Sequence, residues 1–310
     1  MIHIDQLYPG LIQKNVPLAP FTSFGIGGPA DFCAEPKTIE QMEALVTEAA
    51  KNRTPYYILG GGSNTLFSDK GFRGLVIRPQ FKRISITENS IIAEAGATIA
   101  QLIQAAAKSD LSGIEVWVGL PGTVGGAVRG NAGAGGVEIK DILSSATILD
   151  LKQQKIIELS NADLELSYRH ATLKDKPWLI VLSATFHLDK KLPAQEQQLL
   201  MKQVLQKRHA TQPKGKSAGC AFKNATDPTT HTTISAGKLI DECGLKGTRV
   251  GGIEISAVHG NFLQNVGTPD TPATQQDVLD TIALIKQTIK AEKNIDLHEE
   301  IQIVPERPST

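Results

Sequence analysis

Residues 119–136 read GLPGTVGGAVRGNAGAGG, and eight of these eighteen positions are glycine. Glycine weakens both helices and strands, because it loses more backbone freedom on folding than any other residue. We therefore expect a loop here rather than an ordinary core helix or strand. In such a loop the backbone turns with positive φ or approaches a ligand closely.

A second glycine cluster, LGGGSN at residues 59–64, follows the apolar run at residues 56–59. Two such loops in one chain favour a large, flat or charged ligand that is held mainly by backbone N–H groups. The alternative is a set of tight turns and bulges. The spacing does not match the phosphate-binding loop GxxxxGK[ST], and no strict GxGxxG opens a helix.

Composition narrows the class of protein. The chain has 310 residues, of which 41% are hydrophobic and 21% are charged, as is typical of a globular protein with more than one domain. Lys plus Arg and Asp plus Glu both number 32, so a nucleic-acid partner is not expected. No apolar run is long enough to span a membrane.

Cysteine usage and the N-terminus bear on location. The three cysteines, Cys33, Cys220 and Cys243, are far apart and show neither a zinc-ligand nor a CxxC spacing. We expect no metal site and a reducing compartment. Residues 1–10 have no basic segment followed by an apolar one, so no signal peptide is expected and the predicted location is the cytoplasm.

Apolar periodicity predicts an α+β fold. Thr98 is expected to cap one helix, and Thr274 and Asp277 have the spacing of a capping pair for another. We expect domains at residues 1–80, 81–190 and 191–310. Strands are expected at 31–35, 56–59, 75–77, 84–87, 91–95, 146–151, 156–159, 179–188 and 300–304, and helices at 39–53, 98–109, 194–209, 236–243 and 273–293.

Three side chains outside the glycine loops are candidates for chemistry. Arg169 could hold a carboxylate or a developing enolate, although a surface ion pair is the simpler reading. Cys220 lies in SAGCAFKN and could donate a proton, although most lone cysteines are buried hydrophobes. Glu300 in the closing strand faces water or a cleft, if Ile301 and Ile303 face the core.

The motifs together resemble the UDP-N-acetylenolpyruvoylglucosamine reductases, from Asn15 to about Pro305. They include TSFGIGG at 22–28, LGGGSNTL at 59–66, the long glycine segment, and Tyr168-Arg169. SAGCAFKN at 217–224, AGKLIDECGLKGTRVGG at 236–252, HGNF at 259–262 and Glu300 complete the set. Several long motifs in one order make the resemblance specific.

The resemblance implies a two-lobed FAD-binding domain of the vanillyl-alcohol oxidase type and a C-terminal substrate-binding domain. It also implies non-covalent FAD, NADPH as the reductant, and a role in peptidoglycan precursor synthesis. The enolpyruvyl ether of UDP-N-acetylglucosamine would be reduced to UDP-N-acetylmuramate. A monomer is expected, with a small molecule as its only partner.

The resemblance also implies residue roles. Arg169 and Glu300 would stabilise an enolate, and Cys220 would donate the proton from a position where the family usually has serine. A thiol is a stronger acid than an alcohol, so the exchange suits a general acid. The implied FAD contacts are Gly60, Gly61, Gly62, Ser63, Asn64, Gly119, Pro121, Gly122, Thr123, Gly125, Gly126, Asn131, Ala132 and Gly133; the implied substrate contacts are Tyr168, Asn224, Lys238 and Asn261.

The sequence departs from the family pattern at several positions. Ala171 replaces a serine beside Arg169, and Thr211 replaces a lysine whose role falls to Lys214 or Lys216. The segment after Asn131 reads AGAGG, without the usual large residue. Two alternatives stay open: another FAD-dependent oxidoreductase on the same scaffold, and a non-catalytic flavin or nucleotide-sugar binder.

Overall fold

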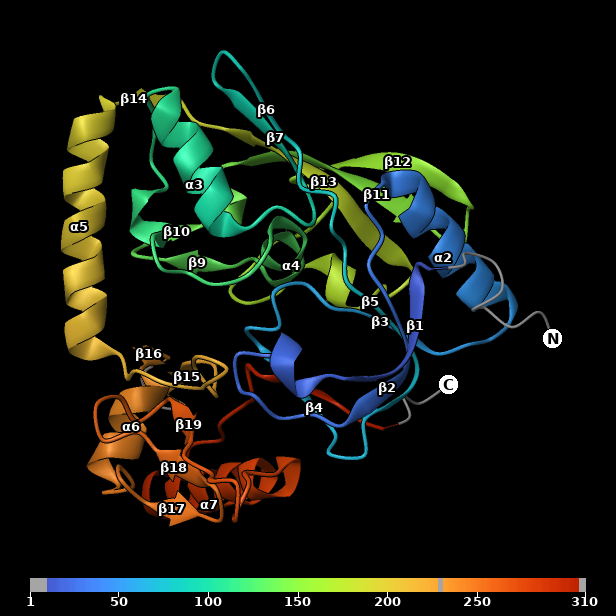
Figure 1. The fold of residues 1–310 in the computed structure, drawn as a ribbon. Helices are drawn as coiled ribbons and strands as arrows, with labels where there is room; N and C mark the ends of the chain where they lie inside the picture. The colour runs from blue at the N-terminus through green and yellow to red at the C-terminus, as the bar shows by residue number, and fades with distance from the viewer. Residues whose placement is uncertain (1–9, 228–230, 307–310) are drawn as a thin grey trace. The chain divides into compact units, whose positions relative to one another are not determined.

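The computed structural model of the protein describes residues 10–227 and 231–306. Contacts between residues divide the chain, whose fold is drawn in Figure 1, into two compact units. The first unit comprises residues 1–13, 32–61 and 74–208, and the second comprises 14–31, 62–73 and 209–310, each over its described residues. The three-part division expected from the sequence stays a prediction. The signal-peptide expectation concerns residues 1–9, which lie outside the described ranges.

A five-stranded antiparallel sheet organises the first unit, in the order β12-β11-β13-β7-β6. On strands β11 and β13, Ala146 lies opposite Ala184 and Ile148 opposite Val181, and the register shifts between Leu143 and Ser145 and again between Thr147 and Ile148. The strands are β6 (Ile84–Thr87), β7 (Ser90–Glu94), β11 (Leu143–Asp150), β12 (Lys155–Ser160) and β13 (Leu179–His187).

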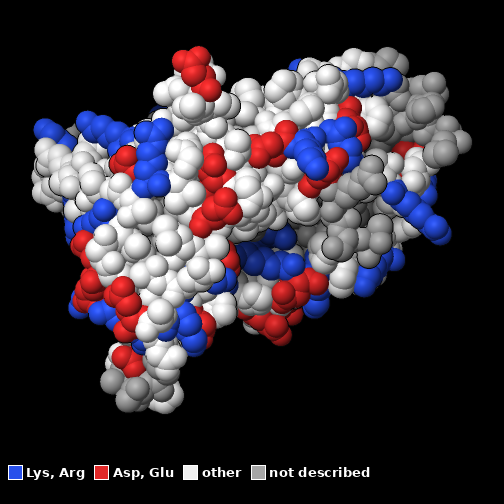
Figure 2. Space-filling view, turned by 90° about the horizontal axis from the view of Figure 1, so that it is seen from below, with Lys and Arg blue, Asp and Glu red and all other residues white. Residues whose placement is uncertain are grey.

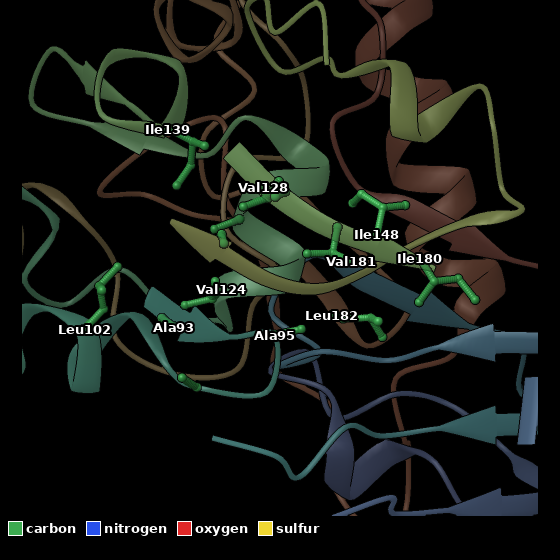
Figure 3. Close-up of a cluster of buried hydrophobic side chains, with 14 of the residues drawn as sticks. Ala93, Ala95, Leu102, Val124, Val128, Ile139, Ile148, Ile180, Val181 and Leu182 are labelled. Atoms are coloured by element: carbon green, nitrogen blue, oxygen red, sulfur yellow. The ribbon is translucent and has the colours of Figure 1, made fainter. Parts of the chain in front are cut away.

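Two helices supply apolar side chains to the core of this unit. α3 (Ile99–Lys108) and α4 (Val124–Gly130) contribute buried residues to the cluster that includes the sheet. Figure 3 shows Val124 and Val128 of α4 in one group with Ile148 and Val181. Both valines are fully buried, so α4 is fixed by the sheet beneath it.

Among the remaining long elements, the helix at 39–51 and the strands at 29–34, 56–58 and 72–77 overlap predicted ranges, whereas the strand at 12–17 was not predicted. α2 (Ile39–Lys51) buries Met42, Leu45, Val46 and Ala49 at helical spacing. A four-stranded sheet has the order β1-β2-β5-β3, in which β3 and β5 are parallel. Its strands are β1 (Ile12–Pro17), β2 (Pro29–Ala34), β3 (Tyr56–Ile58) and β5 (Phe72–Ile77); helix α5 spans Ala194–Thr211.

The second unit has its own apolar core. Helix α7 (Gln275–Lys293) buries Val278, Ile282, Ile285 and Ile289 in this core. A three-stranded antiparallel sheet has the order β17-β18-β19, and β4 pairs in parallel with β20. The elements are β4 (Thr65–Phe67), α6 (Ala236–Glu242), β17 (Arg249–Val250), β18 (Ile253–Ile255), β19 (Leu263–Asn265) and β20 (Gln302–Val304).

Short elements complete the described chain. They matter here because two of them, β9 and β10, form the hairpin that follows α4. They are β8 (Leu111–Ser112), β9 (Gly133–Ala134), β10 (Val137–Glu138), β14 (Lys190–Lys191), β15 (Ala225–Thr226) and β16 (Thr233–Ile234), with 3-10 turns at Ala19–Phe21, Glu115–Trp117, Ile139–Asp141 and Thr172–Lys174.

The expectation of a loop throughout residues 119–136 is wrong at α4. The helix forms because Val124, Ala127 and Val128 have the i, i+3, i+4 spacing of one buried face. Asn131 ends it in the left-handed conformation at φ +43°. Burial of that face therefore outweighs the cost of three glycines in one short helix. Outside the helix, Gly119 and Gly122 do have positive φ, as predicted.

The closing strand also differs from its expected alternation. Ile301 is 5% exposed, whereas Ile303 is 38% exposed, so the two isoleucines do not share a buried face. The strand begins only at Gln302, and the N–H groups of Glu300 and Ile301 both donate to the carbonyl of Ala221. This irregular start interrupts the two-residue repeat.

None of the described helices is both long and apolar enough to cross a bilayer. On the face shown in Figure 2, acidic and basic side chains are interspersed, in keeping with the zero formal net charge.

The predicted caps are present. Thr98 and Gln101 form a reciprocal capping box on α3, and Thr274 and Asp277 form one on α7. Asp277 Oδ2 also accepts the N–H of Gly252, at 3.1 Å, which ties the helix start to the neighbouring turn.

We predict that Thr274→Ala lowers the free energy of unfolding by about 1 kcal/mol, because the N-cap hydroxyl accepts an otherwise unpaired helix N–H. Thr274→Ser should recover most of this loss. The control is Thr288→Ala in the middle of the same helix, where the hydroxyl only bonds back to the Leu284 carbonyl. Urea unfolding measures all three; equal losses at positions 274 and 288 would contradict the capping role.

Candidate active site

The two glycine loops of the first unit touch each other through their backbones. A Cβ on Gly61 would lie 2.7 Å from Gly122 Cα, and a Cβ on Gly60 would lie 2.6 Å from Thr123 Oγ1. Neither distance leaves room for a side chain. Among the described residues, none accepts a hydrogen bond from the N–H of Gly60 or Gly61. Gly60, Gly61, Gly122 and Thr123 thus form a narrow cradle, in which the N–H groups of Gly60 and Gly61 can donate to a ligand.

Helix α4 begins at this cradle, and two of its glycines have different surroundings. Gly125 donates its N–H to the Ala95 carbonyl, and a Cβ there would lie 2.9 Å from Ala95 Cβ. Gly125 therefore serves helix–strand packing. Gly126 is exposed, and a Cβ there would meet only Thr123 Oγ1, at 3.6 Å. The protein itself gives no reason for glycine at position 126, where alanine would favour the helix by about 1 kcal/mol.

In the second unit, the residues that continue the LGGGSN loop, from Gly62 onward, are packed closely against their neighbours. Gly62 is buried with φ +62°, and a Cβ there would lie 2.0 Å from the Phe21 carbonyl oxygen. No described residue accepts a hydrogen bond from its N–H. Asn64 donates from Nδ2 to the Glu300 carbonyl, at 2.9 Å, and its own carbonyl accepts the Gln302 N–H. Asn64 therefore positions the segment that carries Glu300.

Arg169 occupies a tight turn in the first unit. Ser167 and His170 exchange both backbone hydrogen bonds, and Arg169 between them has φ +55°. This left-handed conformation is unusual for a residue with a long side chain. The guanidinium donates to the Gly133 carbonyl, at 3.4 Å, and lies 4.0 Å from Glu138 and 5.2 Å from the centre of the Tyr168 ring.

Asn131 connects this turn to α4 and to the β9–β10 hairpin. Its side chain is fully buried and makes three hydrogen bonds. Nδ2 donates to the Ser167 carbonyl at 2.8 Å and to Glu138 Oε2 at 3.0 Å, and Oδ1 accepts the Lys140 N–H at 3.0 Å. The Asn131 side chain is thus occupied in bracing the arginine turn, and only its backbone is left for the predicted FAD contact.

Cys220 and Glu300 are brought together in the second unit. Residues 220–222 run between two neighbouring segments: Cys220 pairs with Phe262 on one side, and Phe222 pairs with Glu299 on the other. The Glu300 N–H donates to the Ala221 carbonyl at 2.8 Å. Two of the three predicted catalytic residues therefore lie on hydrogen-bonded neighbouring segments, while the third, Arg169, belongs to the first unit.

The predicted substrate-binding residues have different surroundings. Asn261 is 3% exposed, and its amide bonds both backbone groups of Phe222, so it holds the segment after Cys220. Asn224 is exposed and accepts the Ala236 N–H at the start of α6. Lys238 on α6 is 70% exposed and lies 3.7 Å from Glu242. Substrate contact by these residues and by Tyr168 stays a prediction.

Sequence reasoning did not find two residues in these networks. Glu138 accepts from Asn131 and pairs with Lys140 at 3.0 Å, beside Arg169. His259 accepts a hydrogen bond from the backbone of Asn261. His259 lies in the HGNF motif and Glu138 lies in none, but the sequence shows the role of neither, because their contacts depend on the path of the folded backbone rather than on a spacing. No group of metal-ligating side chains occurs within the described ranges, where none was expected.

Comparison with known proteins identifies the class and then the family. Residues 30–160 match the model of the FAD binding domain family, which covers the cradle and α4. Residues 211–304 match the model of the UDP-N-acetylenolpyruvoylglucosamine reductase C-terminal domain, which covers Cys220 and Glu300. The chain thus carries an FAD-binding domain followed by a reductase C-terminal domain. It belongs to the UDP-N-acetylenolpyruvoylglucosamine reductase family.

Individual relatives extend over almost the whole chain. The reductase of Clostridium novyi is 39% identical, over 95% of this chain and 92% of its own. That of Protochlamydia amoebophila is 40% identical, over 97% of each. The crystal structure of the reductase from Thermus caldophilus matches with a TM-score of 0.77 and 34% identity, over 95% of this chain and 99% of its own. The predicted family and the α+β fold with an FAD-binding domain are confirmed.

We predict that Asn131→Gly lowers the free energy of unfolding by about 2–3 kcal/mol, because three buried hydrogen bonds lose their partner. Asn131→Ala should lose about 1 kcal/mol more, since alanine also resists the left-handed conformation. Denaturant unfolding of both variants tests the expectation. Losses below about 1 kcal/mol for both would mean that Asn131 does not brace this turn.

Proposed function

We propose that this protein reduces the enolpyruvyl ether of UDP-N-acetylglucosamine to UDP-N-acetylmuramate, with bound FAD and with NADPH as the reductant. Family membership supports the reaction. The observation that carries the assignment of chemistry to this chain is the pairing of the Cys220 segment with the Glu300 segment. The cytoplasmic location, the monomeric state and the three domain boundaries stay predictions from the sequence.

The cradle fits FAD. Gly60, Gly61 and Gly122 would hold it through backbone, because no side chain fits where the loops meet. Gly126, which the fold does not require to be glycine, would allow a flat ring to lie on α4. Bound FAD would supply the hydride that reaches the methylene carbon of the substrate, after reduction by NADPH.

Arg169 has the task of holding negative charge. Hydride addition to the methylene carbon leaves an enolate that is conjugated with the substrate carboxylate. A guanidinium can bind both oxygens of that group and stabilise the charge as it develops. The turn at residues 167–170, Gly133 and Glu138 restrain the Arg169 side chain before substrate arrives, which lowers the cost of ordering it.

Cys220 and Glu300 complete the reaction. The enolate carbon takes a proton from the Cys220 thiol to give the lactyl ether, and the resulting thiolate recovers a proton from water. Glu300 orients the substrate carboxylate from the neighbouring segment, which Asn64 holds in place. Because the Glu300 segment is hydrogen-bonded to Ala221, the residue next to Cys220, a shift of one segment would displace the other.

The direct test is product analysis. Incubation of the protein with FAD, NADPH and UDP-N-acetylglucosamine enolpyruvate should give a product with two added hydrogen atoms, as measured by mass spectrometry. UDP-N-acetylglucosamine without the enolpyruvyl group serves as the control; with it, NADPH consumption should stop, in the absence of oxygen, after the one equivalent that reduces the bound FAD. Continued consumption of NADPH with both compounds, or with neither, would contradict the proposed function.

We predict that Cys220→Ala leaves reduction of bound FAD by NADPH nearly unchanged but slows reoxidation by substrate by at least ~100-fold, since only the second step needs a general acid. Cys220→Ser should retain substantial activity, because a hydroxyl can donate from the same place. Stopped-flow absorbance separates the two steps. Equal slowing of both steps would exclude Cys220 as the proton donor.

We predict that Gly126→Ala weakens FAD binding by at least ~10-fold without loss of stability, because the added methyl fits the protein but not a ligand on the helix. The matched control is Gly130→Ala at the other end of α4, where a Cβ meets nothing within 4 Å. Titration of apoprotein with FAD, followed by fluorescence, measures both. Unchanged affinity in Gly126→Ala would place the flavin elsewhere.

A further inference from the structure

The turn at residues 259–262 in the second unit carries a histidine that the proposed mechanism does not use. The Nδ1 atom of His259 accepts the Asn261 N–H at 3.2 Å, and the His259 carbonyl accepts the Phe262 N–H at 3.0 Å. The imidazole lies edge-to-face with the Phe262 ring, at 5.0 Å between centres. A Cβ on Gly237 would come within 2.8 Å of Cε1, so the ring is also packed against α6.

This turn is coupled to Cys220 by a short series of hydrogen bonds. The carbonyl of Asn261 accepts the Ala221 N–H at 2.8 Å. Its side chain accepts the Phe222 N–H at 2.9 Å and donates to the Phe222 carbonyl at 2.8 Å. Asn261 therefore binds the two residues that follow Cys220 at three points, and His259 fixes the backbone of Asn261 itself.

We propose that His259 is a positioning residue: its unprotonated Nδ1 holds Asn261, and through Asn261 it holds the segment that presents Cys220. When Nδ1 is protonated it becomes a donor that faces the Asn261 N–H, and the turn must open. The inference rests on the proposed role of Cys220 as proton donor. It assigns the pH sensitivity of that step to a residue outside the proposed catalytic set.

The surroundings of His259 favour the unprotonated state. Burial lowers the pKa of His259 below its ordinary value; a backbone hydrogen bond partly opposes this effect, and the nearby positive charge of Lys246 adds to it. Lys246 is itself held by Asp241 of α6 at 2.7 Å, and the other charges of α6, Lys238 and Glu242, lie 3.7 Å from each other. Since the folded state disfavours the proton, the contribution of His259 is complete above about pH 6.5 and is lost as the pH falls through its lowered pKa.

The test uses His259→Asn and His259→Ala in the full-length protein. The Asn Oδ1 atom can accept the Asn261 N–H from the place of Nδ1, and it does not titrate. We expect His259→Asn to match wild type at pH 7.5. As the pH falls through the lowered pKa of His259, flavin reoxidation by substrate should slow roughly five- to tenfold in wild type, as for one lost hydrogen bond, but not in His259→Asn. His259→Ala should be slow throughout the pH range. His209→Asn, at an exposed position of α5, should behave as wild type.

A second readout does not depend on turnover. Hydrogen exchange of residues 218–224, corrected for the intrinsic effect of pH, should rise in wild type as the pH falls through the His259 pKa. It should be raised throughout the pH range in His259→Ala and should not rise in His259→Asn. If wild type and His259→Asn respond alike to pH in exchange, the inference is wrong. If exchange behaves as expected but substrate does not reoxidise the flavin of wild type at any pH, the proposed function fails and the role of His259 in holding the segment stands.

Discussion

The contact between the backbones of Gly61 and Gly122 is the constraint on which the site of the first unit depends. No side chain fits between the two loops, so the surface that they form together consists of N–H groups and bare backbone. Such a surface can approach a planar or phosphorylated ligand more closely than a surface of side chains can. The fold therefore requires glycine at both places. It does not require glycine at position 126, where we propose that a ligand does.

In the second unit, hydrogen bonds from asparagine side chains and neighbouring backbone hold the candidate catalytic segments in place. Its proposed proton donor lies on a segment that is hydrogen-bonded on both sides, to Asn261 and to Glu300. Asn64 donates a hydrogen bond to the Glu300 carbonyl, so a residue of the LGGGSN loop holds the segment that carries Glu300. Two buried asparagines, Asn131 and Asn261, each satisfy several backbone groups at once, which makes the segments around them rigid.

The sequence predicted the long elements well, because the helices at α2, α3 and α7 bury residues at clear helical spacing. It failed at α4, where three glycines concealed the buried face of Val124, Ala127 and Val128. It also failed at Ile301 and Ile303, where an irregular start of the strand breaks the alternation. In both places long-range packing outweighed local preference.

The candidate site was predictable in part. Motifs predicted roles for Arg169, Cys220 and Glu300, which stay predictions, but they could not distinguish residues that would touch a ligand from residues that hold other residues in place. Asn131 and Asn261 belong to recognisable motifs, yet their side chains are occupied by the protein's own backbone. The sequence did not show the roles of His259, which lies in the HGNF motif, or of Glu138, since their partners depend on the path of the folded chain.

We propose that this chain binds FAD on glycine backbone and that the bound FAD passes electrons from NADPH to an enolpyruvyl ether. The most direct measurement is the anaerobic visible spectrum of the FAD-loaded protein during stepwise additions. We expect NADPH to bleach the flavin and UDP-N-acetylglucosamine enolpyruvate to restore its absorbance. A protein that does not take up FAD, or a bleached flavin that the substrate does not reoxidise, would contradict the account.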